Sequence, residues 1–122
     1  MIKFELLKDI GVLALEPKDA LSTEDFQEIS RVIDPYIREK GKLTGLLIEA
    51  ASFPGWESFG AMASHFRFVR DHHKAIKKIG VVTDSALGNV AEHLASHFVS
   101  AEIRHFSAKE LQSATNWVMN RP

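Results

Sequence analysis

Two histidines, His93 and His97, have the spacing that most resembles a metal site. Four positions apart on a predicted helix, they share one face, as a pair of zinc ligands would. A metalloprotease would need an acid after the first histidine, whereas Glu92 precedes it, and the spacing indicates no third ligand. The apolar stripe of that helix lies elsewhere, so polar residues on a solvated face are the favoured interpretation. We therefore predict no metal site.

The sequence also lacks the common signatures of catalysis and nucleotide binding. It has no G-x-S-x-G, G-x-x-x-x-G-K or G-x-G-x-x-G motif, and it contains no cysteine. His72 and His73 could shuttle protons, but histidines at a helix end also complement the helix dipole, which is the favoured account. Asp84 and Ser85 follow a strand where sheets often place ligands, although capping the next helix is the favoured explanation. We predict a non-enzymatic protein with no catalytic residue and no cofactor.

Length and composition predict one domain over residues 1–122. A chain of 122 residues can bury one core, and 45% hydrophobic with 25% charged residues is ordinary for globular proteins. The first residues alternate charged and apolar types and do not resemble a secretory signal. No stretch approaches the roughly 18 apolar residues that a spanning helix needs. Together with the absence of cysteine, these features lead us to expect a cytoplasmic protein.

Hydrophobic periodicity predicts the element order ββαβαβαβα. The alternation over residues 2–7 and a short connection to residues 11–16 predict an antiparallel hairpin. The remaining strands are expected at residues 43–50, 76–83 and 102–106, with helices at 22–40, 56–73 and 87–98 and after Ser107. Strands joined by helices pair in parallel through right-handed connections. The predicted fold class is α/β, a mixed five-stranded sheet with the helices on one side.

Four strings occur in order along the chain. They are Phe53-Pro54-Gly55-Trp56, Phe68-Val69-Arg70-Asp71-His72-His73, Ile79-Gly80-Val81-Val82-Thr83-Asp84 and Ser100-Ala101-Glu102-Ile103-Arg104-His105-Phe106. With the element order, they resemble the SpoIIAA-like family, which is related to the STAS fold. The resemblance implies a small cytoplasmic bacterial protein, frequent self-association, binding of apolar ligands or membrane surfaces, and no known reaction. Thr83 departs from the family, in which glycine more often precedes the aspartate.

The second predicted helix combines aromatic rings with positive charge. Its apolar stripe is expected to comprise Trp56, Phe59, Met62, Phe66 and Val69. Phe68 falls off that stripe, on a face shared with Ala61, Ser64, His65 and His72. Between His65 and Lys78 the only anion is Asp71, and the cations are Arg67, Arg70, Lys74, Lys77 and Lys78. Five cations against one anion give this segment a net charge of +4, whereas the whole chain carries −1.

A basic helix with aromatic rings suits an amphipathic ligand or a membrane surface, because cations attract anionic headgroups while rings enter the interface. We predict a binding or regulatory domain that takes a lipid or another small apolar molecule, or that contacts the inner membrane face peripherally. The predicted binding residues, in a cleft between this helix and the strand ends, are Trp56, Phe59, Met62, Phe66, Phe68, Arg67, Arg70 and Lys74. Core packing is the alternative for each ring, although Phe68 resists it. Nucleic acid is not an expected partner, because the basic cluster is small and the pI is about 6.6.

A STAS-type protein-interaction module is the alternative function. The resemblance implies a phosphorylatable serine at the start of a helix, as in anti-sigma antagonists, and Ser58 is the nearest match. The usual Asp-Ser-Ser/Thr-Gly string is missing, and a serine in a first helical turn needs no further explanation. Helices on one side would also leave the other face of the sheet partly uncovered, and a second copy could bury it. We therefore expect a homodimer.

Overall fold

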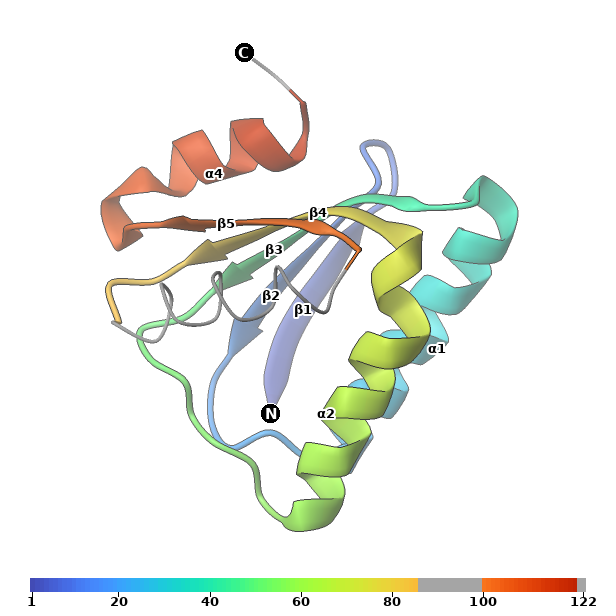
Figure 1. Cartoon of the computed structure of the whole chain (residues 1–122), viewed down its shortest axis with the longest axis vertical. Coiled ribbons are helices and arrows are strands. Elements are labelled where there is room, and N and C mark those ends of the chain that lie inside the picture. The colour runs from blue at the N-terminus through green and yellow to red at the C-terminus, as the bar shows by residue number, and fades with distance from the viewer. Residues whose placement is uncertain (86–99, 121–122) are drawn as a thin grey trace.

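The computed structural model describes residues 1–85 and 100–120, which form a five-stranded sheet with helices on both faces (Figure 1). The strands are β1 (Ile2–Leu7), β2 (Val12–Pro17), β3 (Leu43–Glu49), β4 (Ile76–Val82) and β5 (Glu102–Phe106). The helices are α1 (Thr23–Lys40), α2 (Phe59–His72) and α4 (Leu111–Val118), with short 3-10 turns at His73–Ala75 and Ala108–Glu110. The helix predicted at residues 87–98, with His93 and His97, lies outside the described residues.

The strands follow one another across the sheet in chain order, β1-β2-β3-β4-β5. β1 and β2 form an antiparallel hairpin in which Ile2 lies opposite Pro17 and Leu7 lies opposite Val12. The pairs β2-β3, β3-β4 and β4-β5 are parallel. The predicted fold class, a mixed sheet with an antiparallel N-terminal hairpin and parallel βα units, is therefore confirmed.

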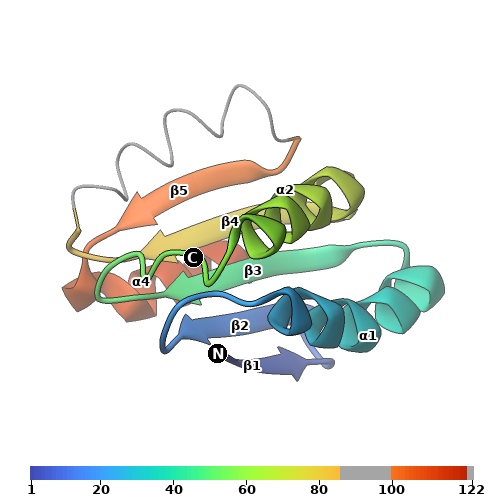
Figure 2. The ribbon, with the colours of Figure 1, turned by 90° about the horizontal axis from the view of Figure 1, so that it is seen from below.

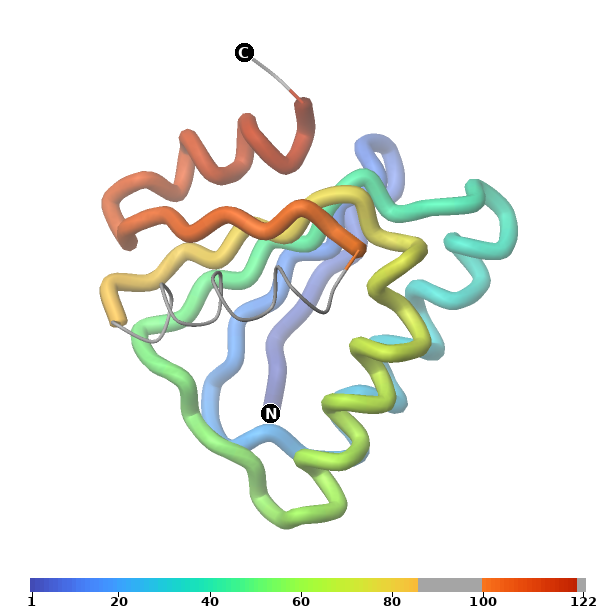
Figure 3. The backbone as a smooth tube through the Cα atoms, in the orientation of Figure 1, coloured from blue at the N-terminus to red at the C-terminus, as the bar shows by residue number. Residues whose placement is uncertain are grey.

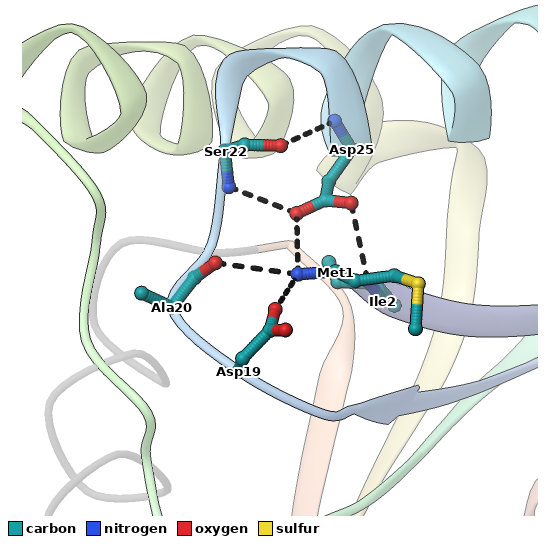
Figure 4. Close-up of polar contacts among 6 residues, drawn as sticks. All are labelled: Met1, Ile2, Asp19, Ala20, Ser22 and Asp25. Carbon is teal, nitrogen blue, oxygen red and sulfur yellow. Dashed lines mark hydrogen bonds and ion pairs between the residues drawn. The ribbon is translucent and has the colours of Figure 1, made fainter.

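Asp25 joins the edge strand β1 to the first turn of α1 (Figure 4). Its carboxylate accepts hydrogen bonds from the backbone N–H of Ile2, at 3.1 Å, and of Ser22, at 2.8 Å. Ser22 caps the helix in return, since its hydroxyl accepts from the Asp25 N–H at 3.2 Å. The α-amino group of Met1 also contacts Asp19 and Asp25. Burial alone would raise the pKa of Asp25, but the hydrogen bonds and the Met1 charge bring it below its usual value.

Two apolar cores lie on the two faces of the sheet. The larger core packs α1 and α2 against the sheet, and its buried members include Leu13, Phe26, Ile29, Ile33, Leu43 and Leu46. The second core lies between the sheet and α4, and it contains Val12, Leu47, Val82, Phe106, Ala114 and Val118. The sequence-based expectation that all helices lie on one side is therefore wrong. Because α4 follows the last strand, no crossover back into the sheet dictates its side, and Figure 2 shows α4 on the side opposite α1 and α2.

α4 approaches the sheet closely because glycine occupies two sheet positions beneath it. A Cβ atom at Gly45 would lie 2.8 Å from Val118 Cβ, and one at Gly80 would lie 3.1 Å from Val118 Cγ1. α4 begins after a capping box in which Ser107 N–H donates to Glu110 Oε1 at 2.9 Å. The sequence predicted both Ser107 and Glu110 as a helix start. The two glycines then set how near the helix can pack.

Candidate functional site

The loop before α2 is fixed to the segment before α1. Leu21 N–H donates to Gly55 O at 2.8 Å, and Glu57 N–H donates to Leu21 O at 2.9 Å. These bonds form a short parallel bridge between Leu21 and Trp56, and Figure 3 shows the two segments side by side. Ser58 then caps α2, since its hydroxyl accepts from Ala61 N–H at 3.1 Å. Trp56 therefore belongs to the loop, and α2 begins later than the sequence indicated.

The inner face of α2 is formed by Ala61, His65, Phe68 and His72, which recur at helical spacing. Ala61 and His72 are buried, and the Phe68 ring lies 5.8 Å from the Phe26 ring of α1. The predicted orientation of Phe68, away from the core, is wrong, because the face it shares with two histidines is the buried one. Periodicity placed the larger apolar residues inward, but both histidines find partners on this face, where His65 is partly buried and His72 is buried.

His72 links the end of α2 to α1. One ring nitrogen, Nδ1, lies 2.8 Å from Phe68 O, and the other, Nε2, lies 2.7 Å from Asp34 Oδ1. The ring also stacks on Phe68 with centroids 4.3 Å apart. The sequence could not indicate this contact, because Asp34 lies 38 positions away along the chain.

His65 connects the interior to Trp56, a half-buried residue of the loop before α2. Trp56 Nε1–H donates to His65 Nδ1 at 3.1 Å, and the His65 ring stacks on Phe26 with centroids 4.9 Å apart and planes at 14°. Burial lowers the pKa of His65 below its usual value, which favours the neutral ring that can accept this bond. His65 thereby supports Trp56 from the protein side.

Above this support lies the aromatic patch, formed by the exposed rings of Phe53, Phe59 and Phe66 together with the half-buried ring of Trp56. Phe53 and Phe66 each meet the Trp56 ring edge to face, with centroids 4.9 and 5.8 Å away. Phe59 is 86% exposed, Phe66 57% and Phe53 41%. The apolar stripe predicted through Phe59 and Phe66 therefore lies on the outside of α2. Phe53 was not among the predicted site residues, although the string Phe53-Pro54-Gly55-Trp56 contains it.

Positive charge flanks the aromatic patch on the same helix. Arg67, Arg70 and Lys74 are exposed, and Arg70 Nε lies 3.0 Å from Asp71 Oδ1. Phe59, Phe66 and Arg70 recur at helical spacing on the outer face of α2.

Lys78 is separate from these cations. Its Nζ donates to Trp117 O and Asn120 Oδ1, at 3.1 and 2.6 Å, and lies 4.8 Å from the centroid of the Trp117 ring on the α4 side. The basic segment from the sequence therefore divides between the two faces of the sheet.

The predicted site residues do not line one cleft. Phe68 packs into the core with Phe26, whereas Phe59 and Phe66 are exposed on the outer side of the helix. Met62 and Trp56 are half-buried, so their exposure is intermediate between that of the core ring and that of the exposed rings. The exposed members thus form a surface of rings and cations on the outer side of α2, supported from within by His65 and Phe68.

A model of the SpoIIAA-like family matches residues 12–119, which is most of the chain. The chain belongs to the SpoIIAA-like family. The resemblance seen in the four sequence strings is thereby confirmed. No curated protein matches the chain.

A solved structure shares the fold of this SpoIIAA-like chain. It is the crystal structure of an uncharacterised protein of the DUF3478 family with a SpoIIAA-like fold, from Shewanella loihica PV-4. The two chains align with a TM-score of 0.75 over 97% of this chain and 92% of the other, at 21% sequence identity. At this identity the likeness concerns the fold. Within the described residues, no helix has the length and apolar character needed to cross a membrane.

Proposed function

We propose that this SpoIIAA-like domain is a non-enzymatic binding domain that contacts anionic membrane surfaces peripherally through the outer side of α2. The observation that carries the proposal is the exposure of Phe59 and Phe66, at 86% and 57%, beside Arg67, Arg70 and Lys74. Large rings left in water at a helix surface mark a place where another apolar phase is expected to cover them. The neighbouring cations favour a phase that carries negative charge at its boundary.

The expected free energies of binding suit a reversible attachment of the protein to a membrane. Removing one phenylalanine side chain from water contributes about 1.5–3 kcal/mol, and each cation near an anionic bilayer about 1 kcal/mol. Two phenylalanines and three cations therefore supply several kcal/mol before the cost of immobilising the protein. Asp71 beside Arg70 reduces the electrostatic part. Weak, salt-sensitive binding is the expected behaviour.

A flat surface fits the geometry better than an enclosed small molecule. The exposed rings lie on the convex side of a helix, where a bilayer can receive several of them at once. A free lipid or another small apolar ligand would leave much of the patch in water. The small-ligand interpretation is therefore the second outcome that the same experiment can reveal.

The test is vesicle co-sedimentation with phosphatidylcholine alone and with added phosphatidylglycerol. We expect binding only to the anionic vesicles, with loss in high salt. Phe59→Ser and Phe66→Ser should each weaken it severalfold. Leu111→Ser is the matched control, because Leu111 is an exposed apolar residue of α4, on the opposite side of the sheet.

Equal binding by wild type and the two phenylalanine variants would exclude the α2 surface. Native mass spectrometry of the purified protein tests the small-ligand interpretation, since a co-purified lipid adds a discrete mass. Such an adduct without vesicle binding would favour a carrier of single molecules.

A protein-interaction module is the second candidate, and membership of the SpoIIAA-like family supports it. Ser58 is exposed at the N-terminus of α2, where a phosphate would be electrostatically favourable. It would also place negative charge beside Phe59 and oppose an anionic membrane. Phosphopeptide mass spectrometry of protein isolated from several growth phases tests this candidate, and unmodified Ser58 in all of them would exclude phosphorylation there.

A further inference from the structure

β1 forms a free edge of the sheet in the described part of the chain. It pairs with β2 on one side, and Figure 2 shows it as the outermost drawn strand on the other. An edge strand presents a row of backbone donors and acceptors to which another strand can add.

Two hydrogen bonds show which backbone groups of β1 point toward the free edge and which point toward β2. Lys18 N–H donates to Met1 O at 2.9 Å, so the Met1 carbonyl faces β2. Ile2 N–H instead donates to Asp25 Oδ1, so the backbone N–H of Ile2 points away from β2. Backbone direction alternates along an antiparallel strand, and Phe4 and Leu6 therefore also present their N–H and C=O groups at the edge.

We propose that two copies of the chain associate by antiparallel pairing of their β1 strands about a two-fold axis at Phe4. In this register Phe4 lies opposite Phe4 of the partner subunit, and Leu6 lies opposite Ile2 of the partner subunit. The Phe4 and Leu6 N–H groups reach the partner's Phe4 and Ile2 carbonyls. Each Ile2 N–H keeps its bond to Asp25, so the Leu6 carbonyl gains no donor from the partner strand. The result is one continuous sheet across both copies.

The charges of β1 select this register. With Phe4 at the axis, Lys3 lies opposite Glu5 of the partner subunit, and the symmetry provides the same pair twice. A register centred on Glu5 would place the two Glu5 carboxylates opposite each other, which is unfavourable. Within its own chain Glu5 lies opposite Ala14, so the residue directly opposite it on β2 is uncharged.

An exposed apolar side chain above the same edge supports the second copy as occupant. Asp25, Val32 and Tyr36 recur on one face of α1. Asp25 contacts Ile2 of β1, and the Tyr36 hydroxyl lies 3.5 Å from Lys8 O in the hairpin turn. Val32 lies between them on this face of α1 and is 39% exposed. A partner strand paired with β1 would bring its own α1 alongside and shield this residue.

This inference is independent of the proposed membrane contact, because β1 and the outer side of α2 are different surfaces. The test is a charge swap read by sedimentation velocity over a range of concentrations. Glu5→Lys places two like-charge pairs across the dimer, and we expect about tenfold weaker association. Lys3→Glu should do the same, and the double variant Lys3→Glu/Glu5→Lys should restore the wild-type dimer.

Two controls keep the result interpretable. Lys3 also faces Glu16 within the chain, so the thermal midpoint of each variant must stay near that of wild type. Glu57→Lys makes the same charge change as Glu5→Lys at an exposed loop position and should leave association unchanged. Amide hydrogen exchange adds a direct readout, since the Phe4 and Leu6 amides should be protected only in the dimer.

A chain that remains monomeric at high micromolar concentration would overturn the proposal. So would a dimer that both single variants and the double variant leave equally strong, since β1 charges would then not lie at the interface. A dimer with fast exchange at the Phe4 and Leu6 amides would place the interface elsewhere.

Discussion

Trp56 donates its indole N–H to Nδ1 of His65, and this bond of 3.1 Å joins the aromatic patch to the interior. The acceptor nitrogen must be unprotonated for the bond to form. The His65 ring also lies between the buried Phe26 ring and the exposed Phe66 ring, with centroids 4.9 and 6.1 Å away. The position of the exposed rings therefore depends on the protonation state of a residue beneath them.

The first prediction concerns the pH dependence of His65. Burial lowers its pKa in the folded state below the ordinary 6.5, so its contribution to stability is complete above that pH. The contribution is lost as the pH falls through the folded pKa, where protonation also removes the acceptor for Trp56. An NMR titration of the ring protons should show a midpoint below 6.5.

A comparison with His65→Phe isolates this contribution, because phenylalanine keeps the stacking on Phe26 without a titrating group. The free energy of unfolding of the wild type should fall more steeply between pH 7 and pH 5 than that of the variant. Equal slopes would show that His65 does not carry the pH dependence.

The second prediction concerns Asp25. Replacing it with asparagine removes the negative charge and one of the acceptors that hold Ile2 and Ser22. We expect a loss of about 1–2 kcal/mol in urea unfolding at pH 7. Glu24→Gln, at an exposed neighbouring position in the same turn, should cost much less. A similar loss for both variants would attribute the effect to the helix dipole alone.

Asp25 should also make the stability of the folded protein sensitive to acid. Its folded pKa lies below the ordinary 3.8, so its stabilising contribution is present above that value and is lost as the pH falls through the folded pKa. The wild type should therefore lose more stability than Asp25→Asn between pH 5 and pH 2. Circular dichroism during an acid titration measures the difference, and parallel curves would contradict it.

The third prediction uses two glycines as a matched pair. Gly45→Ala brings a methyl group to 2.8 Å from Val118 Cβ and 3.0 Å from Val118 O, and should cost about 1–3 kcal/mol. Gly60→Ala meets only Ser58 Oγ at 3.5 Å, within the first turn of α2. It should stabilise by about 0.5–1 kcal/mol through helix propensity. Thermal unfolding of both variants checks the opposite signs, and a tolerated alanine at position 45 would mean that α4 shifts freely.

The fourth prediction concerns the link between His72 and Asp34. Because Asp34 is partly exposed, the pair should contribute only about 1 kcal/mol, after allowance for solvent screening. A double-mutant cycle with His72→Gln and Asp34→Asn measures this coupling apart from the loss of ring packing. Strict additivity of the two single variants would show that the contact does not hold α2 against α1.

Local signals in the sequence predicted most of the fold. The alternation of Ile2, Phe4 and Leu6 indicated β1, and the capping pairs at Ser22 and Ser107 indicated two helix starts. These features depend on neighbours within a few positions, which a single sequence displays.

The orientation of α2 depended on residues far apart in the chain. Phe59 and Phe66 were placed on the inner stripe by hydrophobicity, whereas the structure turns His65 and His72 inward and fully buries only His72 of the two. Those histidines are accommodated by Trp56 and Asp34, and no local pattern reports such contacts. The side taken by α4 was unpredictable for a similar reason, because it depends on packing against strand residues distant in the chain, among them Val12, Leu47 and Gly45.

The placement of α1 and α2 on one face of the sheet, with α4 on the other, has a consequence for the proposed pair of chains (Figure 2). Side chains that lie opposite each other on neighbouring strands point to the same side, so both copies would carry α2 on the same face of the joined sheet. One bilayer could then hold both helices at once, and the second attachment would become intramolecular. Weak individual contacts would add up to avidity, so that the fraction bound to membranes would rise steeply with protein concentration.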